Sequence, residues 1–321
     1  MESSFSFRSG GRERGDRGGP AIDAGRPVSA SPTRVTAVVL NWCGEDDSRA
    51  CLGSLLAADY RALTLLLVDN GSPDGSGERL HAAFPGIAYL QTGANLGYTG
   101  GNNRGIAWAL EAGAEHVLVL NNDTVVERDA VTCLVDAATA GPGVGAVAPK
   151  ILYFDAPDRI WFGGGEFSPL RGAGVHQRQR ERDVPGADPG VRDITFVTGC
   201  CCLLSAEALR RVGGFAEDFF AYVEDVELSL RLSRAGYRLL YQPAARVLHR
   251  VSPGAPTPPS AFQILHRDRN RRRLARRHFN WLDRLRFAGW FYPSRVVRLA
   301  QYASRGDWAR ASAVWRGMRE A

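Results

Sequence analysis

Long hydrophobic runs are missing from this sequence of 321 residues. Its apolar runs, such as Val35–Leu40, Leu63–Val68 and Val117–Leu120, have the length of a β-strand. A membrane-spanning helix needs about 18–20 apolar residues. The N-terminal stretch MESSFSFRSGGRERGDRGG has no apolar core of the signal-peptide type either. We therefore expect no export, which favours a cytoplasmic protein.

Cysteine is also scarce, with six residues in a chain too long to be a disulfide scaffold. Three of them, Cys200, Cys201 and Cys202, are adjacent, a spacing that suits neither a zinc knuckle nor a redox pair. We interpret these three as small, buried, apolar side chains in a reducing compartment.

Lysine occurs only at Lys150, so the net charge of +6 is carried by arginine. The charge is uneven, because residues 261–321 hold 15 Arg against four acidic residues, or +11. The first 260 residues hold 25 basic and 30 acidic residues, or −5. This distribution is typical of a basic segment that meets an anionic surface. Signatures of helix-turn-helix, zinc-finger and RNA-recognition proteins are lacking, so we expect no nucleic-acid partner.

What the sequence does contain is an alternation of strands and helices that starts at Val35. Strand-like runs are predicted at 35–40, 63–68, 87–91, 116–120 and 144–148, and helices at 46–57, 74–83, 98–112 and 130–140. Units of this length imply right-handed crossovers. The sequence therefore predicts an α/β, Rossmann-like fold with a mostly parallel central sheet and helices on both faces.

The remaining segments are less regular. Residues 1–33 are rich in Gly, Ser, Arg and Pro and are predicted to be a disordered tail. Beyond 150 we predict Gly-rich or Pro-rich loops at 163–174 and 183–190, broken strand material at 193–204, helices at 206–212 and 224–235, and strands at 237–241 and 245–249. A Pro-rich linker at 252–260 precedes a basic helical segment at 261–321.

Four polar or glycine-rich segments directly follow apolar strands. They are Asn41-Trp42, Asp69-Asn70, 93–101 and 121–123. Ligands of open parallel sheets bind beyond the carboxyl ends of the strands. We therefore expect these segments to converge at one edge of the sheet.

Two of these segments carry acidic groups with a chemical interpretation. Asp123 at a strand end is placed to hold a divalent metal against a diphosphate. Asp69 is placed to accept the imide N–H of a pyrimidine, and Trp42 to stack on a base. The alternatives are a capped turn at Asp123, a plain turn at Asp69 and core packing at Trp42.

The glycine-rich loop at 93–103 opens a helix. Its glycines let backbone N–H groups approach an anion, and the helix N-terminus adds a favourable potential. The dinucleotide fingerprint and the lysine of a P-loop are both missing. A tight turn with close helix packing is the alternative.

Glu224 and Asp225 start a helix directly after the aromatic run Phe219–Tyr222. The helix dipole favours ionised carboxylates there, and the aromatic neighbours exclude water, so this pair is a candidate for general-base chemistry. His249, at the end of the last strand, is a candidate second metal ligand. The alternatives are ordinary N-terminal helix charge and a hydrogen-bonded structural histidine.

Taken together, the motifs resemble those of the inverting family-2 glycosyltransferases of GT-A fold, in particular the rhamnosyltransferase-like branch. The matching segments occur in order between Val35 and Arg250: VVLNW (38–42), LLLVDNGSPDGS (65–76), GANLGYTGGNNRGI (93–106), VLVLNNDTVV (117–126), GAVAPKI (145–151), FVTGCCCLL (196–204), FFAYVEDVELSLRL (219–232) and LLYQPAARVLHR (239–250). Several long matches in order are far more specific than any single motif.

The resemblance implies a role for each matching position. The implied nucleotide-sugar contacts are Asn41, Trp42, Asp69, Asn70, Asn95, Gly97, Asn103, Asn122 and Gly199. Mg²⁺ or Mn²⁺ is implied at Asp123, with His249 as a further ligand. Asp225 matches the catalytic base, and Glu224 orients the acceptor or the base. Two departures are Asn121, where many relatives have Asp, and Cys43, where this branch often has Asn.

The implied activity is transfer of a sugar, with rhamnose as the first candidate, from a dTDP- or UDP-sugar to a cell-surface or lipid-linked glycan. Residues 34–251 would form the catalytic domain, with a nucleotide-binding half at 34–150 and an acceptor-binding half at 151–251. Such an enzyme would work in the cytoplasm, at the inner face of the cell membrane.

Two other functions are weighed against this one. A sugar-nucleotide pyrophosphorylase should carry a Gly-rich, basic loop after the first strand, but residues 41–47 are acidic and hold no Lys or Arg. A non-catalytic glycan-binding scaffold would have no need of both Asp123 and Asp225.

The basic C-terminal segment has an apolar stripe of its own. The apolar residues at helical spacing are Trp281, Leu282, Leu285 and Ala288, then Val296, Ala300 and Ala303, then Ala311, Val314, Trp315 and Met318. Arginines fill the other faces, a pattern typical of helices that lie on an anionic membrane. Packing on the catalytic body, which we favour as the structural role, and formation of a homodimer are the alternatives.

Overall fold

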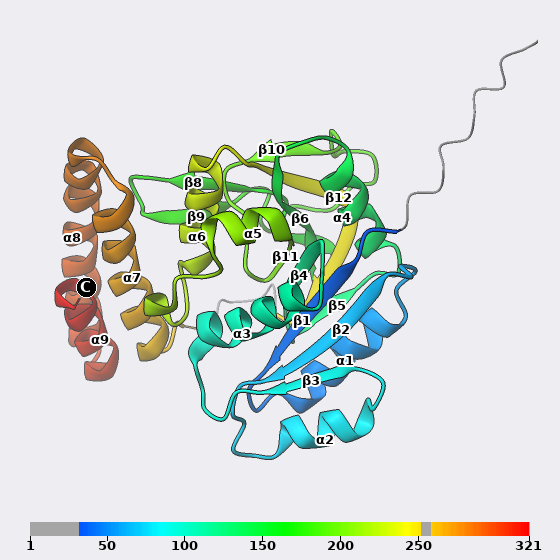
Figure 1. Cartoon of the computed structure of the whole chain (residues 1–321). Coiled ribbons are helices and arrows are strands. Elements are labelled where there is room, and N and C mark those ends of the chain that lie inside the picture. Colours follow the sequence, from blue (N-terminus) through cyan, green and yellow to red (C-terminus); the bar gives the residue numbers. More distant parts are fainter. Residues whose placement is uncertain (1–31, 252–257, 321) are drawn as a thin grey trace, which may run out of the picture. The chain divides into compact units, whose positions relative to one another are not determined.

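The computed structural model describes residues 32–251 and 258–320 (Figure 1). The tail expected over 1–33 and the linker expected over 252–260 therefore lie outside the described residues, except for 32–33 and 258–260. In the described part of the chain, ten strands form one sheet in the order β10-β12-β6-β11-β4-β1-β2-β3, with β5 beside β12 and β7 beside β6. Strands β8 and β9 form a separate hairpin.

The elements alternate closely along the first half of the chain. Its strands are β1 (Val35–Asn41), β2 (Leu63–Asp69), β3 (Ala88–Gln91), β4 (His116–Asn121), β5 (Thr124–Val126) and β6 (Val144–Tyr153), and its helices are α1 (Glu45–Leu56), α2 (Ser76–Ala83), α3 (Gly97–Glu111) and α4 (Ala130–Thr139). The second half holds β7 (Ala156–Phe162), β8 (Gly165–Ser168), β9 (Ala173–His176), β10 (Arg192–Ile194), β11 (Cys201–Ser205), α5 (Ala206–Val212), the 3₁₀ turn η1 (Glu217–Phe219), α6 (Glu224–Arg234) and β12 (Arg238–His249). Helices α7 (Ala261–His278), α8 (Trp281–Ser304) and α9 (Trp308–Arg319) follow.

The predicted mostly parallel sheet with covered faces is confirmed. Strand β1 pairs in parallel with β2 and β4, and β2 pairs in parallel with β3. The first five residues of β1, Val35–Val39, are all buried. Because successive side chains of a strand point to opposite faces, both faces of the sheet must be covered here.

The second half differs from the sequence prediction in three places, and the first is strand β7 (Ala156–Phe162), which was not predicted. The strands expected at 237–241 and 245–249 are the single strand β12, whose register against β6 shifts between Gln242 and Arg246. Pro243, which has no N–H for the ladder, lies in this bulge. The loop expected at 163–174 contains β8, which pairs with β9 as a hairpin.

The predicted burial of the cysteines in β11 is correct, since Cys201 and Cys202 are 0% and 1% exposed.

The sheet topology brings three polar strand ends to one level. Strands β1, β2 and β4 end at Asn41, Asp69 and Asn121. Asn41 is paired in register with Asp69, and Leu40 with Asn121. Because the three strands are parallel, the segments that follow them start from the same edge of the sheet.

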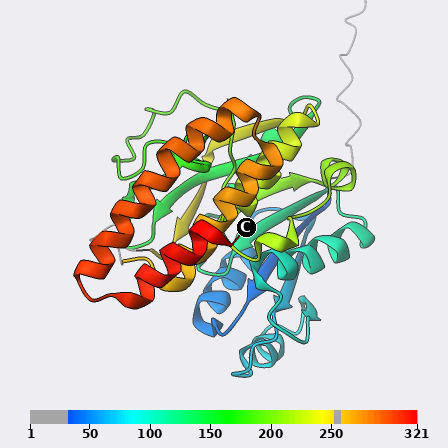
Figure 2. The ribbon, with the colours of Figure 1, turned by 90° about the vertical axis from the view of Figure 1, so that its left-hand side faces the viewer.

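The C-terminal helices pack against one another, and both α7 and α8 contact the body (Figure 2). Helix α8 buries Phe287 and Phe291, and α9 buries Val314. The expected stripe on α8 is not covered, because Trp281 and Leu285 remain 68% and 63% exposed. Within the described residues, no helix combines the length and apolar character needed to cross a bilayer.

Candidate active site

A pocket of about 570 Å³ opens at the carboxyl edge of the parallel strands. Its lining residues are Leu40, Trp42, Asn70, Asn95, Gly97, Tyr98, Asn121, Asn122, Asp123, Phe220, Ala221, Tyr222 and Phe262. The four polar or glycine-rich segments that were expected to converge all contribute residues to the pocket lining. Six of the predicted site residues line the pocket directly, namely Trp42, Asn70, Asn95, Gly97, Asn122 and Asp123.

Asn41 and Asp69 lie beneath the pocket and are fully buried. The Asn41 Nδ2 group donates to the hydroxyl of Ser76 at 2.9 Å and to Asp69 at 3.3 Å. One Asp69 oxygen accepts from the Ser72 hydroxyl at 2.5 Å, and the other accepts from Gln91 Nε2 at 2.8 Å. These bonds tie together the ends of β1, β2 and β3. Because both carboxylate oxygens are occupied, contact between Asp69 and a base stays a prediction.

The glycine-rich loop is held by Asn70. Its Nδ2 group donates to Asn95 Oδ1 at 3.2 Å and to the Gly97 carbonyl at 3.1 Å. Gly97 has a φ of +73°, and a Cβ atom there would lie 2.5 Å from the ring of Phe220. A glycine is therefore required where the loop meets the aromatic segment before α6.

Asp123 and His249 meet at the pocket wall, although they come from distant parts of the sequence. His249 Nε2 lies 3.2 Å from Asp123 Oδ1, and the histidine ring packs edge-on against Trp161. His249 is only 5% exposed, whereas Asp123 lines the pocket. The buried Oδ1 atom of Asp123 has no hydrogen-bond partner. Among the described residues, no group of three or more His, Cys, Asp or Glu is clustered as a ready metal site.

Asp225 lies next to the pocket, behind Tyr98. Its Oδ2 atom accepts from the Gly199 N–H at 3.0 Å, and the Gly199 carbonyl accepts from the Tyr98 hydroxyl at 2.7 Å. Burial raises the pKa of Asp225, while hydrogen bonds from the backbone N–H groups of Gly199 and Val226 and the charge of Arg267 act in the opposite direction. Asp225 is thus a partly exposed residue whose carboxyl group has a raised pKa.

Glu224 is more deeply buried than its neighbour. Its side-chain atom Oε2 is buried and has no hydrogen-bond partner. Burial first, and the charge of Asp225 second, raise the pKa of Glu224 well above its ordinary range. The negative charge of each carboxyl group therefore disfavours ionisation of the other.

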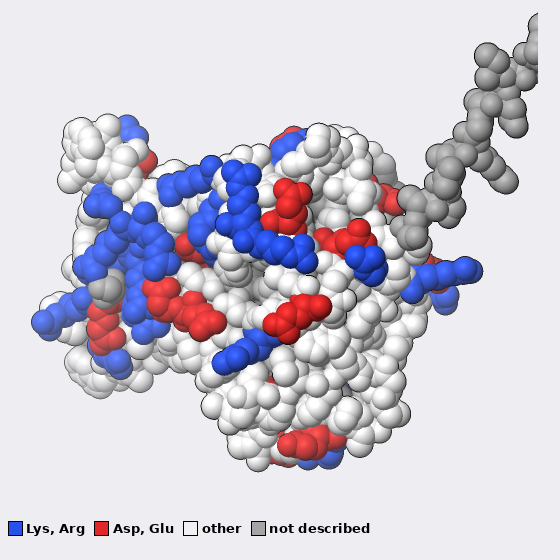
Figure 3. Space-filling view, in the orientation of Figure 1, with Lys and Arg blue, Asp and Glu red and all other residues white. Residues whose placement is uncertain are grey.

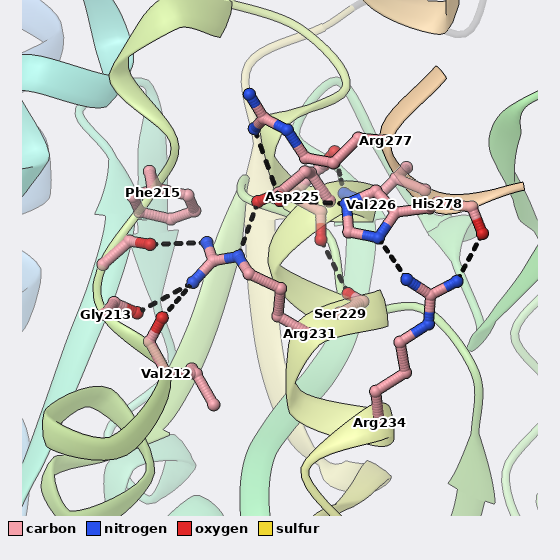
Figure 4. A network of polar contacts seen from close by, with 12 residues as sticks. Val212, Gly213, Phe215, Asp225, Val226, Ser229, Arg231, Arg234, Arg277 and His278 are labelled. Carbon is pink, nitrogen blue, oxygen red and sulfur yellow. Dashed lines mark hydrogen bonds and ion pairs between the residues drawn. The ribbon is translucent and has the colours of Figure 1, made fainter. Parts of the chain in front are cut away.

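The helix that carries Asp225 is fixed by buried ion pairs (Figure 4). Glu227 of α6 is 1% exposed and accepts from Arg231 Nε at 2.8 Å and from His278 Nε2 at 3.0 Å. Arg231 also donates to the carbonyls of Val212 and Gly214. Helix α6 is thereby joined to the segment after α5 and to the end of α7.

Helix α7 supplies site residues that the sequence analysis missed. The buried Asn270 donates through Nδ2 to the carbonyls of Phe219, Ala221 and Tyr222 at 2.8, 2.9 and 2.8 Å. This segment needs such support, because Tyr222 has a φ of +69° and is therefore strained. Phe262 of the same helix lines the pocket. A single Asn in an arginine-rich helix gave no sequence signal for this role.

Asn103 and Gly199 are two further predicted site residues that do not line the pocket. Asn103 joins α3 to the segment before η1, since its Nδ2 donates to the Phe215 carbonyl at 2.8 Å and its Oδ1 accepts from the Phe215 N–H at 2.8 Å. Gly199 lies between Tyr98 and Asp225, where a Cβ atom would be 2.9 Å from the Tyr98 hydroxyl. Their predicted contacts with a nucleotide sugar stay predictions.

The fold and this pocket define an α/β protein with a polar and aromatic pocket at the carboxyl edge of its parallel strands. The profile of the family described as Glycosyltransferase like family 2 matches residues 32–275, and the chain belongs to this family. It is 32% identical over 252 residues to the N-acetylglucosaminyl-diphospho-decaprenol L-rhamnosyltransferase of Mycobacterium tuberculosis, covering 72% of this chain and 80% of the relative. A low-salt glycan biosynthesis hexosyltransferase of Haloferax volcanii is 25% identical, with 73% of each chain covered.

Solved structures agree on the fold. The mannosyltransferase PcManGT from Pyrobaculum calidifontis, in complex with GDP-Man and Mn²⁺, has a TM-score of 0.55 at 19% identity and covers 91% of this chain and 83% of its own. GalNAc-T7 with UDP, GalNAc and Mn²⁺ has a TM-score of 0.64 at 15% identity and covers 88% of this chain and 55% of its own. The predicted GT-A fold and the predicted glycosyltransferase family are therefore confirmed, and the pyrophosphorylase and scaffold alternatives are set aside.

Proposed function

We propose that this glycosyltransferase moves a sugar from a nucleoside diphosphate to a hydroxyl group of a lipid-linked glycan, with inversion at the anomeric carbon. The donor is a dTDP- or UDP-sugar, and rhamnose is the first sugar to test because the 32% identical relative is named a rhamnosyltransferase. One observation carries the proposal: Asp123, beside His249, lines the same pocket as Tyr98, which adjoins Asp225 through Gly199.

Asp225 acts as the general base in this proposal. It takes the proton of the acceptor hydroxyl as the oxygen attacks the anomeric carbon. Backbone N–H groups of Gly199 and Val226 hold the carboxylate at 3.0 and 2.8 Å, so it does not need to reorganise during the reaction. The aromatic side chains of Tyr98, Phe220 and Tyr222 line the pocket and limit the access of water.

Asp123 and His249 fit a divalent cation. A buried carboxylate oxygen without a hydrogen-bond partner and a histidine nitrogen 3.2 Å from it would be suitable donors for Mn²⁺ or Mg²⁺. Such an ion, when bound, neutralises the charge of the diphosphate leaving group.

A donor screen by thermal shift tests this proposal. In the presence of Mn²⁺, dTDP-rhamnose or a UDP-sugar is expected to raise the melting temperature, and the shift should disappear with EDTA. Asp123→Asn should lower the Mn²⁺-dependent donor affinity at least about tenfold, since one anionic ligand is lost. Asp129→Asn, which changes a nearby acidic residue outside the pocket, is the matched control. A donor shift that is the same in Asp123→Asn and wild type would contradict the metal assignment.

We also propose that the outward face of α8 brings the enzyme to a membrane surface. Trp281, Leu285 and Val296 are 68%, 63% and 54% exposed, and they share one helix face in a segment with a net charge of +11. Replacing all three by serine is expected to weaken binding to vesicles that contain phosphatidylglycerol by about tenfold or more. Co-sedimentation measures the effect, with a serine triple variant at Leu56, Val184 and Val191, which are also exposed, as the control. Equal sedimentation of both variants would refute the membrane role, and a change in oligomeric state without lipid would indicate the homodimer instead.

A further inference from the structure

A second pocket, of about 340 Å³, lies between α7, α8 and the turn that joins β8 to β9. Its lining residues are Arg171, Pro259, Ile264, Arg267, Asp268, Arg271, Trp290, Ser294, Arg295 and Arg298. Five arginines thus surround one acidic residue in this arginine pocket. The face of the C-terminal helices that is visible in Figure 3 also carries many basic side chains.

The arginines of this pocket are not balanced by the protein. Arg295 is 2% exposed and forms an ion pair with Asp268, with 3.0 Å between Nε and Oδ1. Its buried Nη2 atom has no hydrogen-bond partner, and the buried Nε atom of Arg271 also has none. Buried donors without partners are rare in folded proteins and unfavourable. The observation points to an anion as the missing partner, because guanidinium groups match phosphate oxygens in charge and geometry.

The arginine pocket adjoins the proposed active site through Arg267. The Arg267 guanidinium lies 4.9 Å from the ring centroid of Tyr222, and Tyr222 lines the first pocket. Helix α7 contributes to both pockets, through Phe262 to the first and through Ile264 and Arg267 to the second. A ligand in the arginine pocket would therefore lie close to the acceptor side of the reaction.

We propose that the arginine pocket binds the diphosphate group that links the acceptor sugar to its lipid. This inference rests on the proposed function, because it assigns a site to the acceptor of that reaction. A sugar-diphosphate-lipid carries two negative charges in its linkage, and five arginines against one aspartate leave an excess of positive charge for it. The apolar side chains of Ile264 and Trp290 in the same lining suit the first carbons of a prenyl chain.

Binding is measured first, without any catalytic step. The full chain is titrated calorimetrically in EDTA with inorganic pyrophosphate and with geranyl diphosphate, so that metal-dependent binding at the donor site is suppressed. Wild type and Asp123→Asn should bind both compounds alike. Arg171→Gln combined with Arg298→Gln should weaken binding about tenfold or more, because two charge-assisted contacts are removed. Both residues are exposed at the rim, so their replacement leaves the buried Arg295–Asp268 pair in place.

Arg286→Gln combined with Arg305→Gln is the matched control, since it removes the same charge from exposed arginines outside the pocket. The proposal is overturned if the pocket variant and the control bind the diphosphates equally. It is also overturned if the pocket substitutions weaken binding to phosphatidylglycerol vesicles but change the binding of neither diphosphate, because the ligand is then a lipid headgroup.

Kinetics supplies the second readout. Two acceptors are compared, a sugar-diphospho-prenol and the octyl glycoside of the same sugar. In the Arg171→Gln, Arg298→Gln variant, kcat/KM for the first acceptor relative to the second should fall about tenfold. The fall should come from a higher KM for the diphospho-acceptor. An unchanged ratio would refute the assignment while leaving the glycosyl transfer itself intact. Loss of donor binding in the thermal-shift screen would instead count against the proposed function, so the two failures are distinguishable.

Discussion

Asp225→Asn is expected to lower the rate of sugar transfer by about 10²–10⁴-fold, the usual contribution of a positioned general base. Asparagine has nearly the same shape, but its amide has no basic lone pair to receive the proton of the acceptor hydroxyl. Donor affinity in the presence of Mn²⁺ should stay within a factor of about two, because Asp123 and His249 are untouched. Initial rates of nucleoside diphosphate release, together with donor titration, separate the two effects.

The folded state should tolerate this change. The carboxylate accepts from the N–H groups of both Gly199 and Val226, and an amide can keep only one of these bonds. Against that loss, the neutral amide removes the burial penalty of a charge whose pKa is raised in the folded protein. These two effects on the free energy of unfolding have opposite signs, so we expect a small net change. Asp218→Asn, on the surface near the same segment, is the control, and full activity of Asp225→Asn would refute the assignment.

The pH dependence of wild type follows from the same pKa. Because burial raises the pKa of Asp225, this group is protonated, and inactive as a base, at pH values where an ordinary aspartate is already ionised. The transfer rate should therefore rise with pH along an acid limb that lies above the ordinary Asp pKa of 3.8. The residual activity of the Asp225→Asn variant should no longer rise with pH in this range. A profile of kcat/KM against pH for both proteins is the measurement.

The sequence was sufficient to predict that residues following β1, β2 and β4 meet at one pocket, for a physical reason. Each candidate there follows an apolar strand, and parallel strands bring their carboxyl ends together, so that Asn70 and Asp123 line one pocket as expected. His249 was a candidate metal ligand from its place at the end of the last strand, and the resemblance implied the same role. The residues that separate it from Asp123 carry no pattern that indicates their contact.

The contributions of α7 and α8 depend on packing that local sequence patterns do not encode. Asn270 supports the strained segment before α6 from a helix whose sequence shows little besides charge. On α8 the apolar residues occupy more than one face, and the structure buries Phe287 and Phe291 rather than Trp281 and Leu285. Periodicity alone does not reveal which of two apolar faces meets a partner, because that depends on the shape of the neighbouring surface.

Glu227→Ala is expected to lower the free energy of unfolding by about 3–5 kcal/mol, since removing one partner of a buried ion pair leaves the other uncompensated. Glu227 and His278 are 1% and 5% exposed in their side chains, and Arg231 is 22% exposed, so water replaces the lost contacts poorly. The melting temperature should fall by on the order of 10 °C. Glu227→Gln, which keeps an acceptor but loses the charge, should show a smaller loss.

The loss should depend on pH with a defined sign. The pKa of Glu227 is lowered from its ordinary value of 4.5, because the contacts with His278 and Arg231 outweigh the opposing effect of burial. A carboxylate whose pKa is lowered by folding stabilises the folded state at pH values above its pKa in the unfolded chain. This contribution disappears as the pH falls through its pKa in the folded protein. The difference in unfolding free energy between wild type and Glu227→Ala should therefore be largest near neutral pH and should shrink below about pH 4.

A matched surface variant separates this mechanism from a general loss of charge. Asp193→Ala removes a carboxylate paired with Arg238, in which the two side chains are 61% and 52% exposed, and should change stability by less than about 1 kcal/mol. Chemical unfolding at pH 7 and pH 4 measures both variants. If Glu227→Ala loses no more than Asp193→Ala, or loses the same amount at both pH values, then the ion pairs do not fix α6. The placement of Asp225 would then depend on its backbone hydrogen bonds and on the contacts of Asn270 instead.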